Sequence, residues 1–151
     1  QNFVIEKATE LGVTGIYPFH SDNCAVTNEI ITKKIPKWQK IMYEASKQCE
    51  RADIPKCFEL EKLENITKNF DRVIVFCERI ATKTIKDIEH VKENENILVL
   101  IGPEGGFSKR EFEFFEEQKF EMLTLGDLIL KAETAVIVAL GNIIYEFSGK
   151  N

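Results

Sequence analysis

Apolar residues recur along this chain with a helical period in some segments and in short continuous runs in others. Val4, Ala8 and Leu11 are spaced for one helix face and precede Gly12, which predicts a helix closed by a left-handed glycine. Residues 20–32 are polar and mixed and predict a loop. We expect the next helix to begin at Pro36, because proline is well tolerated as the first helical residue. Its apolar stripe consists of Trp38, Ile41, Met42, Ala45 and Cys49.

Short apolar runs predict β-strands between the helical segments. Two runs, Val73–Cys77 and Ile97–Ile101, are continuous, which is typical of strands covered on both faces in a parallel sheet. Shorter strands are expected at Gly15–Phe19, Cys57–Leu60 and Glu121–Leu125. A short helix or turn is expected at Leu63–Phe70, and helices around Ile85 and Ile88 and after Ser108. Because strands and helices alternate throughout, the pattern predicts an α/β fold, a parallel sheet with helices on both faces.

The last predicted helix, from Glu133 to about Phe147, is apolar nearly all the way round. A surface helix carries one apolar stripe, whereas a helix that is apolar on every side is buried on two sides. In a chain of 151 residues, the second side is expected to be covered by another subunit.

The composition is that of a globular domain, with 44% hydrophobic and 30% charged residues in a length that fits one domain. No apolar run approaches the roughly 20 residues of a membrane helix, so no membrane association is expected. The four cysteines form no Cys-x-x-Cys pair, and only His20 and His90 could join them as ligands, which argues against zinc. Three of the four lie in apolar patterns, which indicates buried thiols in a reducing cytoplasm. The net charge of −5 weakens a nucleic-acid interpretation without excluding a local basic stripe.

Two glycine-bearing loops carry the predicted chemistry. The first, Gly102–Gly106, follows a strand and precedes a helix whose start has the capping-box residues Ser108 and Glu111. Its glycines let a ligand approach the backbone, whereas Glu104 would repel a phosphate. The loop is therefore either a structural turn or a binding loop for a ligand with positive charge or many donors.

The second loop, Asp127–Leu130, is unusually apolar for a connection and is followed by Lys131 and Glu133. Such a loop would form one wall of a flat hydrophobic slot with charges at its rim, and a purine ring fits such a slot. From the residues alone, the two loops predict a small-molecule site in an α/β dimer.

Two charged features have two interpretations each. Glu78 and Arg79 follow a buried strand, where they form a loop salt bridge or line the crevice, with Glu78 accepting hydrogen bonds from ligand hydroxyls. The polar face of the helix after Pro36 is rich in lysine and ends near Gln48 and Arg51. That face is either a solvated surface or a basic strip for a polyanion.

Five stretches together carry a resemblance to a known family. They are Glu6–Val13, Glu44–Arg51, Ile54-Pro55, Leu100–Ser108 with Glu111, and Leu125–Ala135. They follow one another in order over almost the whole chain, and the last two are the strongest. On these residues the chain resembles the SPOUT superfamily of RNA methyltransferases. Within it, the chain resembles the ribosomal RNA small subunit methyltransferase E family, which methylates N3 of a uridine in 16S rRNA.

The resemblance implies a SPOUT catalytic domain over residues 1–151 with a C-terminal trefoil knot, S-adenosylmethionine as methyl donor and no metal. It implies a homodimer, joined through the C-terminal helix, that acts on 16S rRNA of the small ribosomal subunit. The family also carries an N-terminal PUA-like β-barrel RNA-binding domain, which is absent here. We expect a fragment whose N-terminal part is missing, although a removed tag or a processed leader would leave the same start at Gln1.

The resemblance also implies the residues of the site. Those expected to contact the donor are Glu78, Ile101, Gly102, Gly106, Leu125, Gly126, Ile129, Leu130 and Ala135, with Glu78 taking the ribose hydroxyls. Those expected to act in catalysis are Arg51, Glu104 and Lys131. Arg51 or Lys131 would stabilise the developing uridine anion, and either Glu104 or water would take the N3 proton. Lys131 stands where the family usually has arginine, and lysine lacks the planar two-pronged hydrogen bonding.

Two other functions stay open at this point. One is a nucleotide- or phosphate-binding α/β module of another class, for which a simple nucleotide would compete better than S-adenosylhomocysteine. The other is a non-catalytic RNA-binding or assembly factor, for which RNA binding would be unaffected by the donor.

Overall fold

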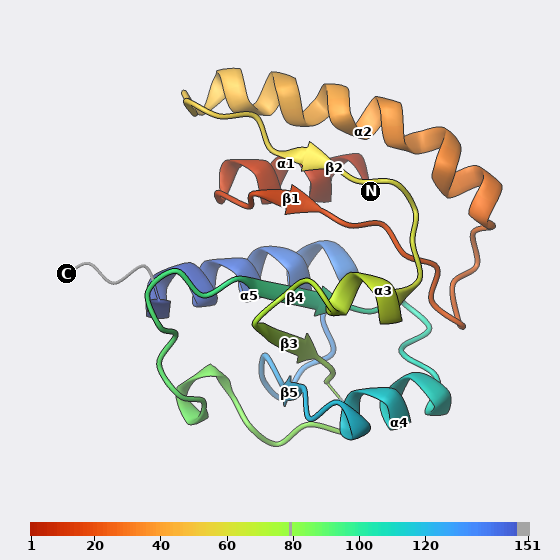
Figure 1. The fold of residues 1–151 in the computed structure, drawn as a ribbon, viewed down its shortest axis with the longest axis vertical. Coiled ribbons are helices and arrows are strands. Elements are labelled where there is room, and N and C mark those ends of the chain that lie inside the picture. The colour runs from red at the N-terminus through yellow and green to blue at the C-terminus, as the bar shows by residue number, and fades with distance from the viewer. Residues whose placement is uncertain (79, 148–151) are drawn as a thin grey trace. The chain divides into compact units, whose positions relative to one another are not determined.

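The computed structural model describes residues 1–78 and 80–147, so Arg79, predicted beside the crevice, lies outside the described residues. The chain forms two compact units, whose elements are labelled in Figure 1. The N-terminal unit contains residues 1–20 and 25–66, and the C-terminal unit contains residues 21–24 and the chain from Thr67 onward. The short segment 21–24 therefore packs with the second unit although the first surrounds it in sequence.

Two helices and a pair of short strands build the N-terminal unit, and a further helix leads out of it. These elements are α1 (Asn2–Glu10), β1 (Gly15–Ile16), α2 (Asn28–Gln48), β2 (Lys56–Cys57) and α3 (Leu63–Thr67). α1 packs against α2, and β1 pairs in parallel with β2. α1 ends at Glu10 with Leu11 as its C-cap, and Gly12 follows at φ +95°, so the predicted left-handed glycine after this helix is confirmed.

The start of α2 differs from the prediction. The helix begins at Asn28, so Pro36 lies inside it and the prediction that proline opens the helix is wrong. Thr27 provides the cap instead, because its side-chain oxygen accepts a hydrogen bond from the backbone N–H of Ile30. Pro36 removes one backbone hydrogen bond, and the burial of Ile31 before it and Trp38 after it offsets that loss.

A three-stranded parallel sheet forms the centre of the C-terminal unit. The elements are β3 (Arg72–Phe76), the 3₁₀ turn η1 (Ile85–Asp87), β4 (Ile97–Ile101), α4 (Lys109–Glu117), β5 (Glu121–Leu123) and α5 (Ala132–Phe147). The strand order is β4-β3-β5, with Ile74 opposite both Val99 and Glu121. The predicted parallel α/β architecture is confirmed, but the described strands form two separate sheets instead of one.

The two continuous apolar runs differ in burial. β3 is the central strand and is buried from Val73 to Phe76, as predicted. β4 was expected to be buried throughout, and this is wrong, because only Leu98 and Leu100 are buried and the alternate residues are half-buried. Ile97, Val99 and Ile101 lie on the face that packs against Ala139 and Ile143 of α5, and this helix covers them only in part.

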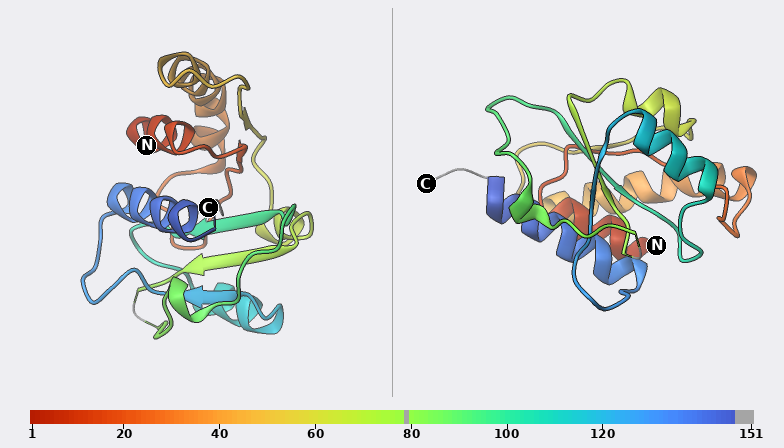
Figure 2. Two further views of the ribbon diagram at one scale, coloured as in Figure 1. Left: turned by 90° about the vertical axis from the view of Figure 1, so that its left-hand side faces the viewer. Right: turned by 90° about the horizontal axis from the view of Figure 1, so that it is seen from below.

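Helices lie on both sides of this sheet (Figure 2). On one face, Ile74, Phe76 and Leu123 pack with Ala139 and Ile143 of α5 in a buried cluster. α4 lies on the other side and contributes Phe115, which is fully buried. Each large apolar side chain buried in this way contributes about 1.5–3 kcal/mol to folding. The apolar side chains of α4 and α5 therefore hold one helix against each face of the sheet.

The remaining local predictions have mixed outcomes. The Ser108–Glu111 capping box at the start of α4 is confirmed, and α5 has nearly the predicted bounds. The segment around Ile85 is a single 3₁₀ turn. Of the thiols expected to be buried, Cys49 is exposed, since it lies just after the end of α2. In the part of the chain that the structure describes, no helix combines the length and apolar character needed to cross a bilayer.

Candidate functional site

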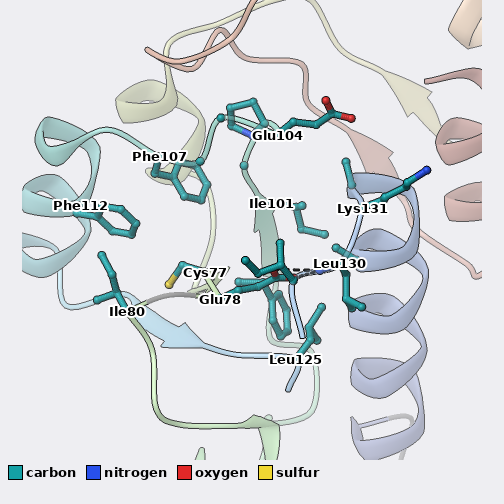
Figure 3. Close-up of a pocket in the computed structure, with 18 residues that line it drawn as sticks. Cys77, Glu78, Ile80, Ile101, Glu104, Phe107, Phe112, Leu125, Leu130 and Lys131 are labelled. Carbon is teal, nitrogen blue, oxygen red and sulfur yellow. Dashed lines mark hydrogen bonds between the residues drawn. The ribbon is translucent and has the colours of Figure 1, made fainter. Parts of the chain in front are cut away.

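The loops that follow the carboxyl ends of β3, β4 and β5 surround one pocket of about 680 Å³ (Figure 3). This edge of a parallel sheet is where open α/β folds bind ligands. Its lining comes entirely from the C-terminal unit, from Phe76 through Ala135. Residues from both 102–106 and 125–135 line this pocket. The two loops therefore lie together, as the predicted small-molecule site requires.

The first loop is a tight turn after β4. The backbone N–H of Gly106 donates to the carbonyl of Pro103 at 2.8 Å, and Gly106 has φ +77°, a conformation that favours glycine. At Gly102 a Cβ would come within 2.9 Å of the Phe107 ring, so glycine is needed for that ring to pack. Phe107 is buried and makes an edge-on contact with Phe115. The glycines thus let the loop turn while α4 anchors its far end.

Segment 21–24 supports this loop from outside the pocket lining. The Ser21 hydroxyl donates to the buried Glu111 carboxylate at 2.9 Å, and Glu111 also accepts from the Ser108 backbone N–H. The side-chain amide of Asn23 donates to the carbonyl of Gly106 at 3.1 Å. These contacts fix the start of α4 and the end of the glycine loop. The sequence analysis missed them, since nothing local in residues 21–24 indicates a partner some 90 residues away.

The second loop is tied to the end of β3. The backbone N–H of Leu130 donates to both oxygens of Glu78, at 3.0 and 3.1 Å. The Thr124 N–H donates to the carbonyl of Lys83 at 2.8 Å, and Gly126 has φ +141°. The Glu78 carboxylate therefore holds the apolar loop, and Glu78 also lines the pocket.

The side chains around the pocket divide into an apolar interior and a charged rim. Ile101, Leu125 and Leu130 point into it in Figure 3, where Glu104 and Lys131 lie toward one end. Within the described residues, neither Glu104 nor Lys131 has a side-chain hydrogen bond or ion pair, so both are available to a ligand. Burial raises the pKa of the Cys77 thiol to about 11. Cys77 is therefore protonated at neutral pH and is a poor nucleophile.

Arg51 belongs to the N-terminal unit and is not among the residues that line the pocket. Its guanidinium donates to the carbonyls of Thr9 and Val13, both at 2.9 Å, and pairs with Asp53 at 2.8 Å. The hydrogen bond from Arg51 lowers the pKa of Asp53. These contacts give Arg51 a structural role at the end of α1, and its catalytic role stays a prediction.

The structure brings together most of the residues predicted for the site. The pocket is lined by the predicted Glu78, Ile101, Gly102, Glu104, Gly106, Leu125, Ile129, Leu130, Lys131 and Ala135. Gly126 is not in the lining, although it shapes the turn beside it. Among the described residues, sequence reasoning missed eight that line the pocket, namely Phe76, Cys77, Ile80, Pro103, Gly105, Phe107, Phe112 and Ala132. Pro103, Gly105 and Ala132 could have been found, because they sit inside the motifs already singled out.

The described residues contain no cluster of three histidine, cysteine or acidic side chains suited to holding a metal ion. A parallel α/β unit with an apolar pocket between a glycine loop and a tethered second loop defines a ligand-binding α/β domain. The family comparison is more specific. The model of the RNA methyltransferase domain family matches residues 1–144, and the chain belongs to that family.

Individual relatives agree with this assignment. The ribosomal RNA small subunit methyltransferase E of Mesomycoplasma hyopneumoniae is 35% identical over 145 residues, covering 91% of this chain and 61% of that protein. The structure of the same-named protein of Neisseria gonorrhoeae, bound to S-adenosyl methionine, superposes with a TM-score of 0.85 at 29% identity, over 97% of this chain and 60% of that one. A Legionella pneumophila protein with bound SAM gives 0.83 at 31% identity, over 95% and 60%. The chain spans about three fifths of these relatives' length.

Proposed function

We propose that this chain is the catalytic part of an S-adenosylmethionine-dependent methyltransferase that methylates N3 of a uridine in 16S rRNA of the small ribosomal subunit. The observation that carries the proposal is the single pocket lined by both family motifs, residues 102–106 and 125–135. Two similar structures hold S-adenosyl methionine, and the curated relatives are named for methylation of small-subunit ribosomal RNA. These findings support the donor and the class of substrate.

The residues of the pocket fit this donor. A volume of about 680 Å³ is in the range of small-molecule sites. A Cβ built on Gly106 would meet no atom within 4 Å, so its backbone is open to a close ligand. Ile101, Leu125 and Leu130 offer an apolar slot for the adenine, with backbone groups for its edge. Gly102, Ile129 and Ala135 would complete the slot, Gly126 would shape it, and the Glu78 carboxylate would accept hydrogen bonds from the ribose hydroxyls.

The chemistry requires the chain to stabilise a uridine anion at N3. S-adenosylmethionine, when bound, supplies an electrophilic methyl group on a sulfonium. Lys131 at the pocket rim provides a positive charge that would favour loss of the N3 proton, and Arg51 is the second candidate for this role. Glu104 at the same rim would accept the proton, or positioning alone would suffice and water would accept it.

We propose that the active form is a homodimer joined through α5 and that it acts in the cytoplasm. We also propose that the C-terminal segment forms a trefoil knot. The hydrogen bonds from Thr124 to Lys83 and from Leu130 to Glu78 tie the segment after β5 to the loop after β3. These contacts support the proposed knot. We propose that the whole protein carries a PUA-like RNA-binding domain besides residues 1–151.

The proposed function is tested by donor binding and methyl transfer. We expect calorimetry to show S-adenosylmethionine and S-adenosylhomocysteine binding to the purified chain, with AMP competing poorly. We also expect labelled methyl transfer to N3 of one uridine in small-subunit particles from a strain without the enzyme, read by mass spectrometry. Better competition by AMP would support the nucleotide-binding module instead. RNA binding that is unaffected by S-adenosylmethionine, together with no methyl transfer, would support the non-catalytic factor.

Glu78→Ala is expected to weaken S-adenosylmethionine binding about tenfold, because the Leu130 N–H loses its acceptor and the apolar loop loosens. A factor of ten corresponds to about 1.4 kcal/mol, which is close to the lower end of the range of about 1.5–3 kcal/mol for a hydrogen bond to a charged group. Glu78→Gln keeps an oxygen acceptor and should weaken binding less. Calorimetry on both variants, with the exposed Glu93→Ala as control, measures this. Binding by Glu78→Ala that equals wild type would exclude the role given to this carboxylate.

A further inference from the structure

The exposed side of α2 carries lysines that neither the fold nor the pocket uses. Lys33, Lys37, Lys40 and Lys47 are separated by four, three and seven residues, so they lie along one face of the helix. All four are exposed. We call this set the lysine stripe. At a rise of 1.5 Å per residue the stripe is about 21 Å long, enough to follow several nucleotides of a single strand.

α2 is positively charged in an acidic chain. It contains five lysines and two glutamates, which gives it a charge of +3. Because the net charge of the whole chain is −5, the residues outside α2 together carry −8. Each of the other four α-helices that the structure describes has a net negative charge. Such a distribution attracts an anionic partner to α2 and disfavours it at the other helices.

The charges of the stripe are largely unneutralised. Within the part of the chain that the structure describes, Lys33, Lys37 and Lys40 form no ion pair. Lys47 lies 3.5 Å from the exposed carboxylate of Glu44, and exposed pairs of this kind are weak. Binding of phosphates at these lysines would therefore break at most the weak ion pair between Lys47 and Glu44.

An aromatic ring lies beside the lysine stripe. Tyr43 is 44% exposed, and the Nζ atom of Lys47 lies 5.1 Å from the centre of its ring. Single-stranded RNA is bound by positive charge for its backbone together with exposed aromatic rings on which bases stack. A single-stranded nucleic acid would use both features, because its phosphates pair with the lysines and a base stacks on the ring. The combination therefore favours RNA.

We propose that the lysine stripe and Tyr43 form a contact surface for single-stranded RNA, with phosphates at the lysines and one base stacked on the tyrosine. The proposal rests on the proposed function, in which RNA is the substrate. It adds a surface in the N-terminal unit, whereas the donor pocket lies in the C-terminal unit. The acidic chain thereby gains a local site for its polyanionic substrate.

The salt dependence of RNA binding tests the stripe. The probe is a labelled single-stranded RNA of about 20 nucleotides, measured by fluorescence anisotropy over a salt series. Replacing all four stripe lysines by glutamine should weaken binding at least about tenfold at low salt and reduce the log–log salt slope by about 3. The matched control replaces the exposed Lys62, Lys68, Lys86 and Lys92 by glutamine. It makes the same change in net charge and should alter the slope much less.

Tyr43 gives a second readout that does not depend on charge. Tyr43→Leu should weaken binding about fivefold or more with an unchanged salt slope, and Tyr43→Phe should retain wild-type affinity. Equal slopes for the stripe and control variants, or no RNA binding by the wild-type chain, would overturn the proposal. Tighter binding of an acidic peptide than of RNA would also overturn it. S-adenosylmethionine binding is measured on the same samples, so intact donor binding in any of these cases leaves the proposed function standing.

Discussion

Gly106→Arg is expected to reduce S-adenosylmethionine binding at least about 100-fold, or 2.7 kcal/mol, while the chain still folds. Gly106 lines the pocket, and no atom lies within 4 Å of where its Cβ would be, so the new side chain has room to extend over the site. The arginine side chain would occupy the part of the pocket that the donor needs. Its positive charge would also lie beside the positively charged sulfonium of the donor. Calorimetry of donor binding and a thermal melt measure the two effects.

The control for this prediction is Gly12→Arg. Gly12 has φ +95° and open space at its Cβ, so arginine there suffers the same kind of backbone strain, about 1–2 kcal/mol. Gly12 belongs to the N-terminal unit and does not line the pocket. We expect Gly12→Arg to lower the melting temperature similarly and to leave donor binding intact. If Gly106→Arg bound the donor like wild type, the pocket would not be the donor site.

The second large effect is expected in the oligomeric state. The wild-type chain should have a mass of twice 17.4 kDa by light scattering, and Ile144→Asp with Tyr145→Asp should reduce it to 17.4 kDa. One side of α5 is buried in its own unit through Ala139 and Ile143, whereas Tyr145 is 87% exposed and Ile144 is exposed beside it. A stable interface buries about 800 Å² per partner, and an unpaired charge buried in it costs about 3–5 kcal/mol.

Ile54→Asp is the matched control for the α5 variant. Ile54 is an exposed isoleucine of the N-terminal unit, so its replacement adds the same kind of charge away from α5 in sequence. It should leave the mass at twice 17.4 kDa. A wild-type chain that is monomeric at all accessible concentrations would contradict the proposed dimer, as would an α5 variant that remains dimeric.

Local signals account for what the sequence predicted well. The Ser108–Glu111 capping box and the glycine after α1 are decided by residues a few positions apart, so they can be identified without tertiary information. The motif residues of both loops were assigned to one site, and most of them line one pocket. That assignment depended on the resemblance, because the residues alone allowed a structural turn at Gly102–Gly106.

The errors share a physical cause, which is that the deciding partner lies far away in sequence. Pro36 is a poor interior helix residue, yet α2 runs through it because Ile31 and Trp38 are buried on either side. Ile97–Ile101 has the composition of a doubly covered strand, but its half-buried residues all lie on the face toward α5, which covers them only in part.

The sequence by itself determined most types of element, the α/β class and the two loops that line the pocket, because periodicity, caps and glycines act within a few residues. Only the tertiary structure decided that Glu78 holds Leu130, that Asn23 holds Gly106 and that Phe107 packs on Gly102. Each of these contacts depends on the path of the backbone between distant segments or on the packing of a ring. Chain packing sets both, and no local pattern encodes them.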